Sequence, residues 1–88
     1  MSVRADLRRY VLENHLFTDD DAALKDADSF LETGVLDSTG IMELILFIEE
    51  TFELKVTDDE MVPENLDSID SLVAYVERKQ QAQQAEQA

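Results

Sequence analysis

The sequence contains no cysteine and a single histidine, His15. Without cysteine, the chain forms no disulfide and offers no thiolate of its own as a nucleophile or a metal ligand. A zinc site or a general base built on one histidine would lack the partner side chains that such sites use. We therefore expect His15 to be a surface residue at the end of a helix.

Basic residues are also scarce, with 7 Lys and Arg against 21 Asp and Glu and a net charge of −14. Such a balance excludes binding to nucleic acid through phosphates and argues against an anionic membrane surface. It indicates partners that carry basic residues and are steered in electrostatically. Positions 26–54 contain no Lys or Arg. The acidic residues there are Asp26, Asp28, Glu32, Asp37, Glu43, Glu49, Glu50 and Glu53. A purely solvated acidic face is the alternative interpretation.

Long apolar runs are absent, and the N-terminus has no apolar segment typical of a signal peptide. We therefore expect a soluble, cytoplasmic protein that is a monomer and binds no membrane. A chain of 88 residues is long enough for one domain. The apolar periodicity ends near position 79, so residues 1–79 are predicted to form the domain and residues 80–88 a polar C-terminal tail.

The spacing of apolar residues predicts helices at about 3–15 and 38–53, and a last helix capped by Ser68. Thr57 and Glu60 form a capping-box pattern, and Pro63 soon follows, so only one short turn is expected at about 58–62. These elements define an all-α fold. The long connection at 16–37 shows too few apolar repeats for a helix. Five of its apolar residues are expected to fold onto the core: Leu24, Phe30, Leu31, Val35 and Leu36.

The connection is rich in carboxylates, but it does not match a calcium-binding loop. An EF-hand starting at Asp19 would need Asp or Asn where Ala23 stands, Gly where Leu24 stands and Glu where Phe30 stands. All these positions fail, so no metal site is predicted.

The centre of the chain carries the most informative pattern, Gly34-Val35-Leu36-Asp37-Ser38-Thr39-Gly40, followed by an apolar and acidic helix. Asp37 or Ser38 is suited to cap that helix. Its core face is predicted to consist of Ile41, Leu44, Ile45, Ile48 and Phe52. Met42 and Leu46 point nearly the opposite way, among glutamates, and form an exposed strip suited to docking another protein. Ser38 would stand at the helix N-terminus, where an anion is favoured.

This pattern resembles the modification motif of the acyl and peptidyl carrier proteins, and the resemblance covers roughly residues 3–79. It implies an antiparallel four-helix bundle with a short third helix and a long loop between helices one and two. It also implies a 4′-phosphopantetheine arm on Ser38, taken from coenzyme A by a phosphopantetheinyl transferase, with Asp37 presenting the serine. The arm would hold an acyl or aminoacyl cargo as a thioester. The docking residues would be Thr39, Met42, Glu43, Leu46, Glu49, Glu50 and Glu53.

Thr39 and Gly40 depart from the fatty-acid carriers, which usually have Leu and an acidic residue after the serine. The motif is more similar to D-alanyl carrier proteins and other free-standing carriers. This similarity implies a client such as an adenylating ligase, or an acyltransferase or synthase, with a basic docking patch. Gly40 also stands in the first turn of the predicted helix. There, glycine costs less than the roughly 0.5–1 kcal/mol relative to alanine that it costs in a helix interior.

The sequence also allows three alternatives to a modified Ser38. Catalysis by Ser38 itself is not expected, because Leu36 stands where a G-x-S-x-G elbow needs its first glycine. Ser68, which follows Asp67, is interpreted as a helix cap because no acidic docking helix follows it. An unmodified acidic adaptor that docks a basic partner through the same strip remains the alternative to a carrier.

Overall fold

The computed structural model describes residues 2–87, with side chains through Ala82. Within this part the regular secondary structure is all helical and contains no strand, so the predicted all-α class is confirmed. The long helices are α1 (Val3–Val11), α3 (Ser38–Phe52) and α5 (Ile69–Gln87), and the short ones are α2 (Phe30–Thr33) and α4 (Pro63–Leu66). Three single turns complete the fold: η1 (Leu12–Leu16), η2 (Asp21–Ala23) and η3 (Asp58–Glu60).

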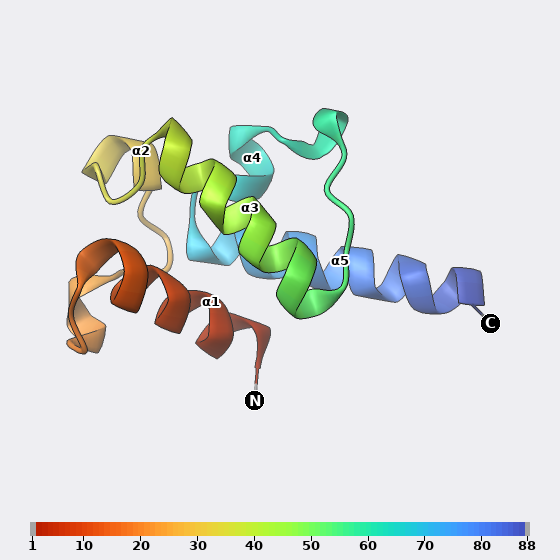
Figure 1. The fold of residues 1–88 in the computed structure, drawn as a ribbon, viewed down its shortest axis with the longest axis horizontal. Helices are drawn as coiled ribbons and strands as arrows, with labels where there is room; N and C mark the ends of the chain where they lie inside the picture. Colours follow the sequence, from red (N-terminus) through yellow and green to blue (C-terminus); the bar gives the residue numbers. More distant parts are fainter. Residues whose placement is uncertain (1, 88) are drawn as a thin grey trace.

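The three long helices form the body of the bundle. Figure 1 shows α1 running in the opposite direction to α3 and α5, with α4 placed above the start of α5. The connection between α1 and α3 passes through η2 and α2 on one side of the molecule. It is long, as predicted, but the sequence did not predict the helical turn α2 within it. None of the helices in the described part of the chain is both long and apolar enough to cross a membrane.

The core lies where these helices meet. Leu7 and Val11 of α1, Leu44 and Ile48 of α3, and Leu72 of α5 are fully buried. Of the predicted core face of α3, Leu44, Ile45 and Ile48 are buried, while Ile41 and Phe52 are half-buried and pack against the core. The periodicity in the sequence therefore identified the inner face of α3 correctly.

The first helix matches its prediction, because α1 continues directly into the π-helical turn η1, ending at Leu16. Ser68 caps α5 by accepting a hydrogen bond from the Ser71 backbone N–H at 3.1 Å. The short turn predicted at about 58–62 is present as η3, and Thr57 and Glu60 form the expected capping box. The sequence did not predict α4, in which Pro63 occupies the first position, where its missing N–H costs nothing.

The predicted tail at 80–88 has a helical backbone continuous with α5 through Gln87. The packing of its side chains beyond Ala82, and residue 88 itself, lie outside the described residues. The domain boundary at position 79 therefore stays a prediction.

The connection between α1 and α2 is fixed mainly by Arg8, whose side chain is only 15% exposed. Its guanidinium donates to the Leu24 carbonyl at 2.9 Å and to the Asp21 carbonyl at 2.6 Å, and it pairs with Asp26. Arg4 adds a second bond to Asp26 at 2.6 Å. Burial opposes the charge on Asp26, but the two arginines outweigh burial and lower the pKa of this carboxyl.

Four of the five apolar residues expected to fold this connection onto the core do so: Leu24, Phe30 and Leu36 are buried, and Val35 packs beside them. Leu31 is the exception, since it is 51% exposed. It lies in α2, and a single helical turn directs Phe30 and Leu31 to different sides. The expectation for Leu31 was therefore wrong, and its exposure bears on the site described next.

Candidate functional site

The site begins at the N-terminus of α3. Asp37 has extended backbone angles and is the N-cap, and its carboxylate accepts the Gly40 backbone N–H at 2.8 Å. Ser38 is the first residue of the helix and is exposed. Because the first N–H groups of a helix have no partner within it, this position favours an anion attached to the serine. Asp37 thus fixes the turn and leaves the Ser38 hydroxyl open to solvent.

Gly40, an unfavourable residue for a helix by propensity, is explained by close packing. It is buried, and a Cβ built there would lie 3.1 Å from Leu36 Cδ2 and 3.5 Å from His15 Cε1. The first turn of α3 therefore rests on η1 and on the residues just before the cap. A side chain at this position would push the Ser38 turn away from its support.

The expectation that His15 is a simple surface residue was wrong. Its side chain is half-buried, and its Nε2 is buried with no hydrogen-bond partner in the described structure. The imidazole lies edge-on to the Tyr10 ring, with 5.4 Å between centroids, and Tyr10 in turn stacks on Phe47 of α3. His15 is therefore a packing residue beneath the N-terminus of α3. The sequence held no sign of this, because the contact joins residues 25 positions apart.

A pocket of about 260 Å³ opens beside Ser38. From α3, Ser38, Ile41, Met42 and Ile45 line one side. The other residues that line it are Leu31, Met61, Val62, Pro63, Leu66 and Asp67. Leu31 is 51% exposed and Val62 37%, which continues the apolar surface of α3 across the pocket. Sequence reasoning missed this second side. The apolar residues of α2 and of the segment before α4 could indicate this second side only after these helices were placed against α3.

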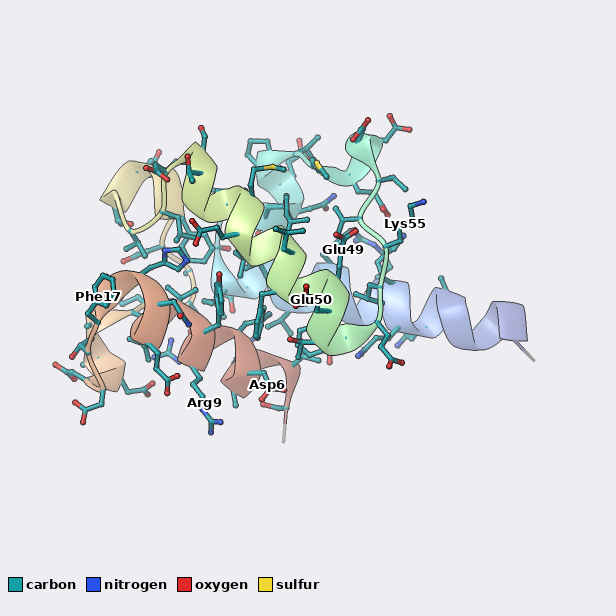
Figure 2. All side chains as sticks on the ribbon, in the orientation of Figure 1. Asp6, Arg9, Phe17, Glu49, Glu50 and Lys55 are labelled. Atoms are coloured by element: carbon teal, nitrogen blue, oxygen red, sulfur yellow. The ribbon has the colours of Figure 1, made fainter. Side chains whose placement is uncertain are left out.

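The predicted docking strip lies on the outer side of α3. Met42 and Leu46 are 51% and 56% exposed, as expected. Thr39, Glu43 and Glu50 are also exposed, and Figure 2 shows Glu50 on the side of α3 that faces the viewer. Within the described part of the chain, these five side chains form an outward-facing surface of apolar residues next to carboxylates.

The two remaining docking residues have further roles. Glu49 is half-buried and accepts the Val56 backbone N–H at 3.0 Å, and Figure 2 shows it on the side of α3 near Lys55. Glu53 is exposed and ends α3 with a φ of 54°, in the left-handed region. Both residues therefore lie at the end of α3, about three turns or more from Ser38.

One side of the pocket is fixed to α5 through Glu60, which directly precedes the pocket residue Met61. Its Oε1 accepts hydrogen bonds from Lys79 Nζ at 3.0 Å, from Tyr75 Oη at 3.2 Å and from the Thr57 backbone N–H at 3.2 Å. Burial raises the pKa of Glu60, but Lys79 and Thr57 outweigh it and lower that pKa to about 2. Burial, reinforced by the charge of Glu60, raises the pKa of Tyr75.

An exposed serine at a helix N-terminus, beside an apolar pocket and an acidic strip, fits a protein that carries a group instead of one that catalyses a reaction. The family described as "Phosphopantetheine attachment site" matches residues 15–76. The chain therefore belongs to the phosphopantetheine-binding carrier proteins, and it acts as a carrier and not as an enzyme. The predicted family and the 4′-phosphopantetheine cofactor are thereby confirmed.

Among curated proteins, the chain is similar to D-alanyl carrier proteins. That of Streptococcus uberis is 40% identical over 63 residues, which cover 72% of this chain and 78% of the relative. That of Streptococcus pyogenes serotype M5 is 38% identical over 66 residues, covering 75% of this chain and 82% of the relative. The similarity of the motif to such free-standing carriers therefore extends over most of the chain.

The residues at the start of α3 fit a covalently attached phosphopantetheine. The exposed Ser38 hydroxyl can form the phosphodiester, and the helix N-terminus favours the negative phosphate next to it. The mainly apolar pocket beside Ser38 offers a surface against which the arm or its cargo can pack. No cluster of three or more potential metal ligands occurs among the described residues.

Proposed function

We propose that Ser38 is the attachment residue and that the protein holds an aminoacyl cargo as a thioester on the arm. The observation that carries this proposal is the position of Ser38. It is exposed and is the first residue of α3, and the Asp37 carboxylate caps this turn by accepting the Gly40 backbone N–H. In the transfer, Ser38 Oγ forms a bond to the β-phosphorus of coenzyme A, and adenosine 3′,5′-bisphosphate leaves. The serine proton goes to a base of the phosphopantetheinyl transferase.

The chain contributes position and accessibility to this chemistry. Asp37 and Gly40 keep the first turn of α3 formed, so that the hydroxyl projects from a fixed point. The arm supplies the thiol that a cysteine-free chain lacks. The cargo forms a thioester with this thiol, and catalysis belongs to the partner enzymes.

The cargo we propose is an amino acid, with D-alanine as the first candidate. The name of the relatives supports this, as does the Ser38-Thr39-Gly40 sequence that departs from fatty-acid carriers. An adenylating ligase would activate the amino acid with ATP and transfer it to the arm. Because loading uses ATP and attachment of the arm uses coenzyme A, we place the protein in the cytoplasm.

The surface that we propose for docking comprises Thr39, Met42, Glu43, Leu46 and Glu50, with Glu49 and Glu53 at its far end. Apolar side chains that are half exposed support a contact that buries them. The surrounding carboxylates support a basic partner patch, which would mainly raise the rate of association. Both the transferase and the ligase would use this surface, because both must reach Ser38.

Intact mass spectrometry tests the attachment. The protein is incubated with coenzyme A, Mg²⁺ and a broad-specificity phosphopantetheinyl transferase, beside the variant Ser38→Ala. We expect one added phosphopantetheine on the natural protein and none on Ser38→Ala. A matched control, Ser68→Ala, keeps its modification because Ser68 is buried at the start of α5. Addition to Ser38→Ala, or no addition while a control carrier is loaded, would contradict the proposal and favour the unmodified adaptor.

Charge reversal tests the docking surface. Glu43→Lys should lower kcat/KM of the transferase about fivefold or more at physiological salt, because it removes attraction and adds repulsion. Glu77→Lys changes the same charge on an exposed position of α5 and should have little effect. Equal effects of the two variants would show that only net charge matters, and the docking surface would be abandoned.

Supplying D-alanine or a medium-chain fatty acid with the corresponding ligase then identifies the cargo by mass.

A further inference from the structure

The short helix α2 depends on a residue far from it in the sequence. It has four residues, whereas isolated helices shorter than about 12–15 residues are marginal in water. Two of its first N–H groups are nevertheless bonded to Asp67. Phe30 N donates to the Asp67 carbonyl at 2.7 Å, and Leu31 N donates to Asp67 Oδ1 at 3.1 Å. Asp67 therefore caps α2 from the junction between α4 and α5.

The local cap of α2 is also tied to Asp67. Ser29 Oγ accepts the Glu32 backbone N–H at 3.1 Å and donates its own proton to Asp67 Oδ2. The carboxylate thus orients the hydroxyl whose lone pair caps the helix. The Asp67 carbonyl and Oδ1 thus accept the first two N–H groups of α2, and Oδ2 orients the Ser29 hydroxyl that accepts the third.

A chain of contacts leads from α2 to the attachment site. The Phe30 carbonyl accepts the Leu36 backbone N–H at 3.4 Å, and Phe30 is buried. The Leu36 side chain lies directly beneath Gly40 in the first turn of α3. Since Asp37 binds Gly40 N, the position of Leu36 decides where the Ser38 turn rests. Asp67 and Leu31 also line the pocket beside Ser38.

The geometry points to Asp67 as a positioning residue for the Ser38 site: it caps α2 from the far side of the pocket and thereby holds the segment that leads into the Ser38 turn. This inference rests on the proposed function, since it assumes that Ser38 receives the arm. Without the cap, α2 opens, and only a fraction of the molecules presents the turn that the transferase binds. The apparent affinity then falls by that fraction, while turnover of the bound complex is unchanged.

The test compares Asp67→Ala and Asp67→Asn with Asp70→Ala as the matched control. Asp70 loses the same charge, but its carboxylate contacts Arg4 and not α2. In the unmodified protein, amide exchange at Leu31 and Glu32 should become about tenfold faster in Asp67→Ala, because the carboxylate accepts Leu31 N and orients the Ser29 hydroxyl that caps Glu32 N. Asp67→Asn should restore much of the protection, because its amide oxygen can still accept from Leu31 N. Asp70→Ala should leave both amides as they are.

The second readout is the transfer of phosphopantetheine to Ser38. In Asp67→Ala we expect KM for the carrier to rise severalfold with kcat unchanged, and Asp67→Asn to recover most of the loss. Unchanged exchange in Asp67→Ala would overturn the cap. Faster exchange with unchanged KM would overturn the positioning role. If Asp67→Ala does not fold, Asp67→Asn decides both points, because its amide nitrogen cannot accept the Ser29 Oγ proton and a smaller rise in exchange and in KM should remain. Absence of transfer to the natural protein would contradict the proposed function instead, and the exchange rates would still decide whether Asp67 caps α2.

Discussion

At the scale of single residues, the site depends on side chains and backbone angles that hold one turn in place. Asp37 caps α3, Gly40 allows the turn to rest on Leu36 and His15, and Ser38 is left exposed. Gly34 ends α2 with a φ of 77°, in the left-handed region that favours glycine. The two glycines of the chain thus serve different purposes, one a backbone angle and the other a close approach.

We predict that Gly34→Ala lowers the free energy of unfolding by roughly 1–2 kcal/mol, because an alanine is strained in the left-handed region. No atom lies within 4 Å of a Cβ placed there, so the loss comes from the backbone alone. Gly34→Asn should recover part of the loss, since asparagine tolerates this conformation. Urea denaturation of the three proteins measures the effect. Equal stability of Gly34→Ala and the natural protein would show that the turn relaxes to another conformation.

At the scale of elements, the short helices are stabilised by tertiary contacts. Arg8 holds the connection between α1 and α2, Asp67 caps α2, and Glu60 fastens η3 to α5. These elements are too short to be stable alone. Leu31 of α2 lines the pocket, and η3 directly precedes the lining residue Met61. Polar contacts of this kind join residues far apart in the sequence, so local sequence patterns do not predict them.

Glu60 gives the element scale a prediction about pH. Its pKa lies near 2 in the folded protein, below the value of about 4.3 for an unperturbed glutamate. The bonds to the carboxylate therefore stabilise the fold above about pH 4.3, and this contribution is lost as the pH falls through that value toward 2. Glu60→Gln should cost about 1–3 kcal/mol at neutral pH. Because the variant has no titrating carboxyl at position 60, the free energy of unfolding of Glu60→Gln should fall less steeply between pH 5 and pH 3 than that of the natural protein.

Urea denaturation at a series of pH values checks this prediction. The control is Asp59→Asn, which neutralises the neighbouring exposed carboxylate in the same turn. Parallel pH profiles for Glu60→Gln and the natural protein would mean that Glu60 contributes nothing to the acid sensitivity, and that other paired carboxylates such as Asp26 account for it.

At the scale of the whole molecule, the charge is the dominant feature. A net charge of −14 on 88 residues repels itself in the folded state, and it also attracts basic partners from a distance. Three of the seven basic residues, Arg4, Arg8 and Lys79, form ion pairs with carboxylates away from the N-terminus of α3. The surface around Ser38 therefore retains its negative charge, which suits a protein that must meet several enzymes in turn.

We predict that Tm rises with salt. Raising the ionic strength from about 0.01 M to about 0.15 M shortens the Debye length from about 30 Å to about 8 Å, which screens the repulsion among the carboxylates. Each kcal/mol gained should raise Tm by roughly 4–8 °C for a domain of this size. The double variant Glu43→Gln/Glu50→Gln has less repulsion and should gain less from salt. A Tm that is constant over this range would refute the prediction.

The sequence by itself determined the helical class, the inner face of α3 and the Asp37-Ser38 motif. These features depend on local spacing: apolar residues repeat with the helical period, and a cap is read from neighbours. The same local information identified Met42 and Leu46 as exposed, because both lie on the side of α3 away from its core face.

Only the tertiary structure decided what surrounds Ser38. Leu31, Val62 and Asp67 approach α3 from other elements, and His15 of η1 packs beneath Gly40. These contacts depend on how helices pack, and a one-dimensional pattern does not contain the distances between segments far apart in the chain. For the same physical reason, α2 was predicted as a loop. Its stability comes from a carboxylate 36 positions beyond Leu31, which no local propensity includes.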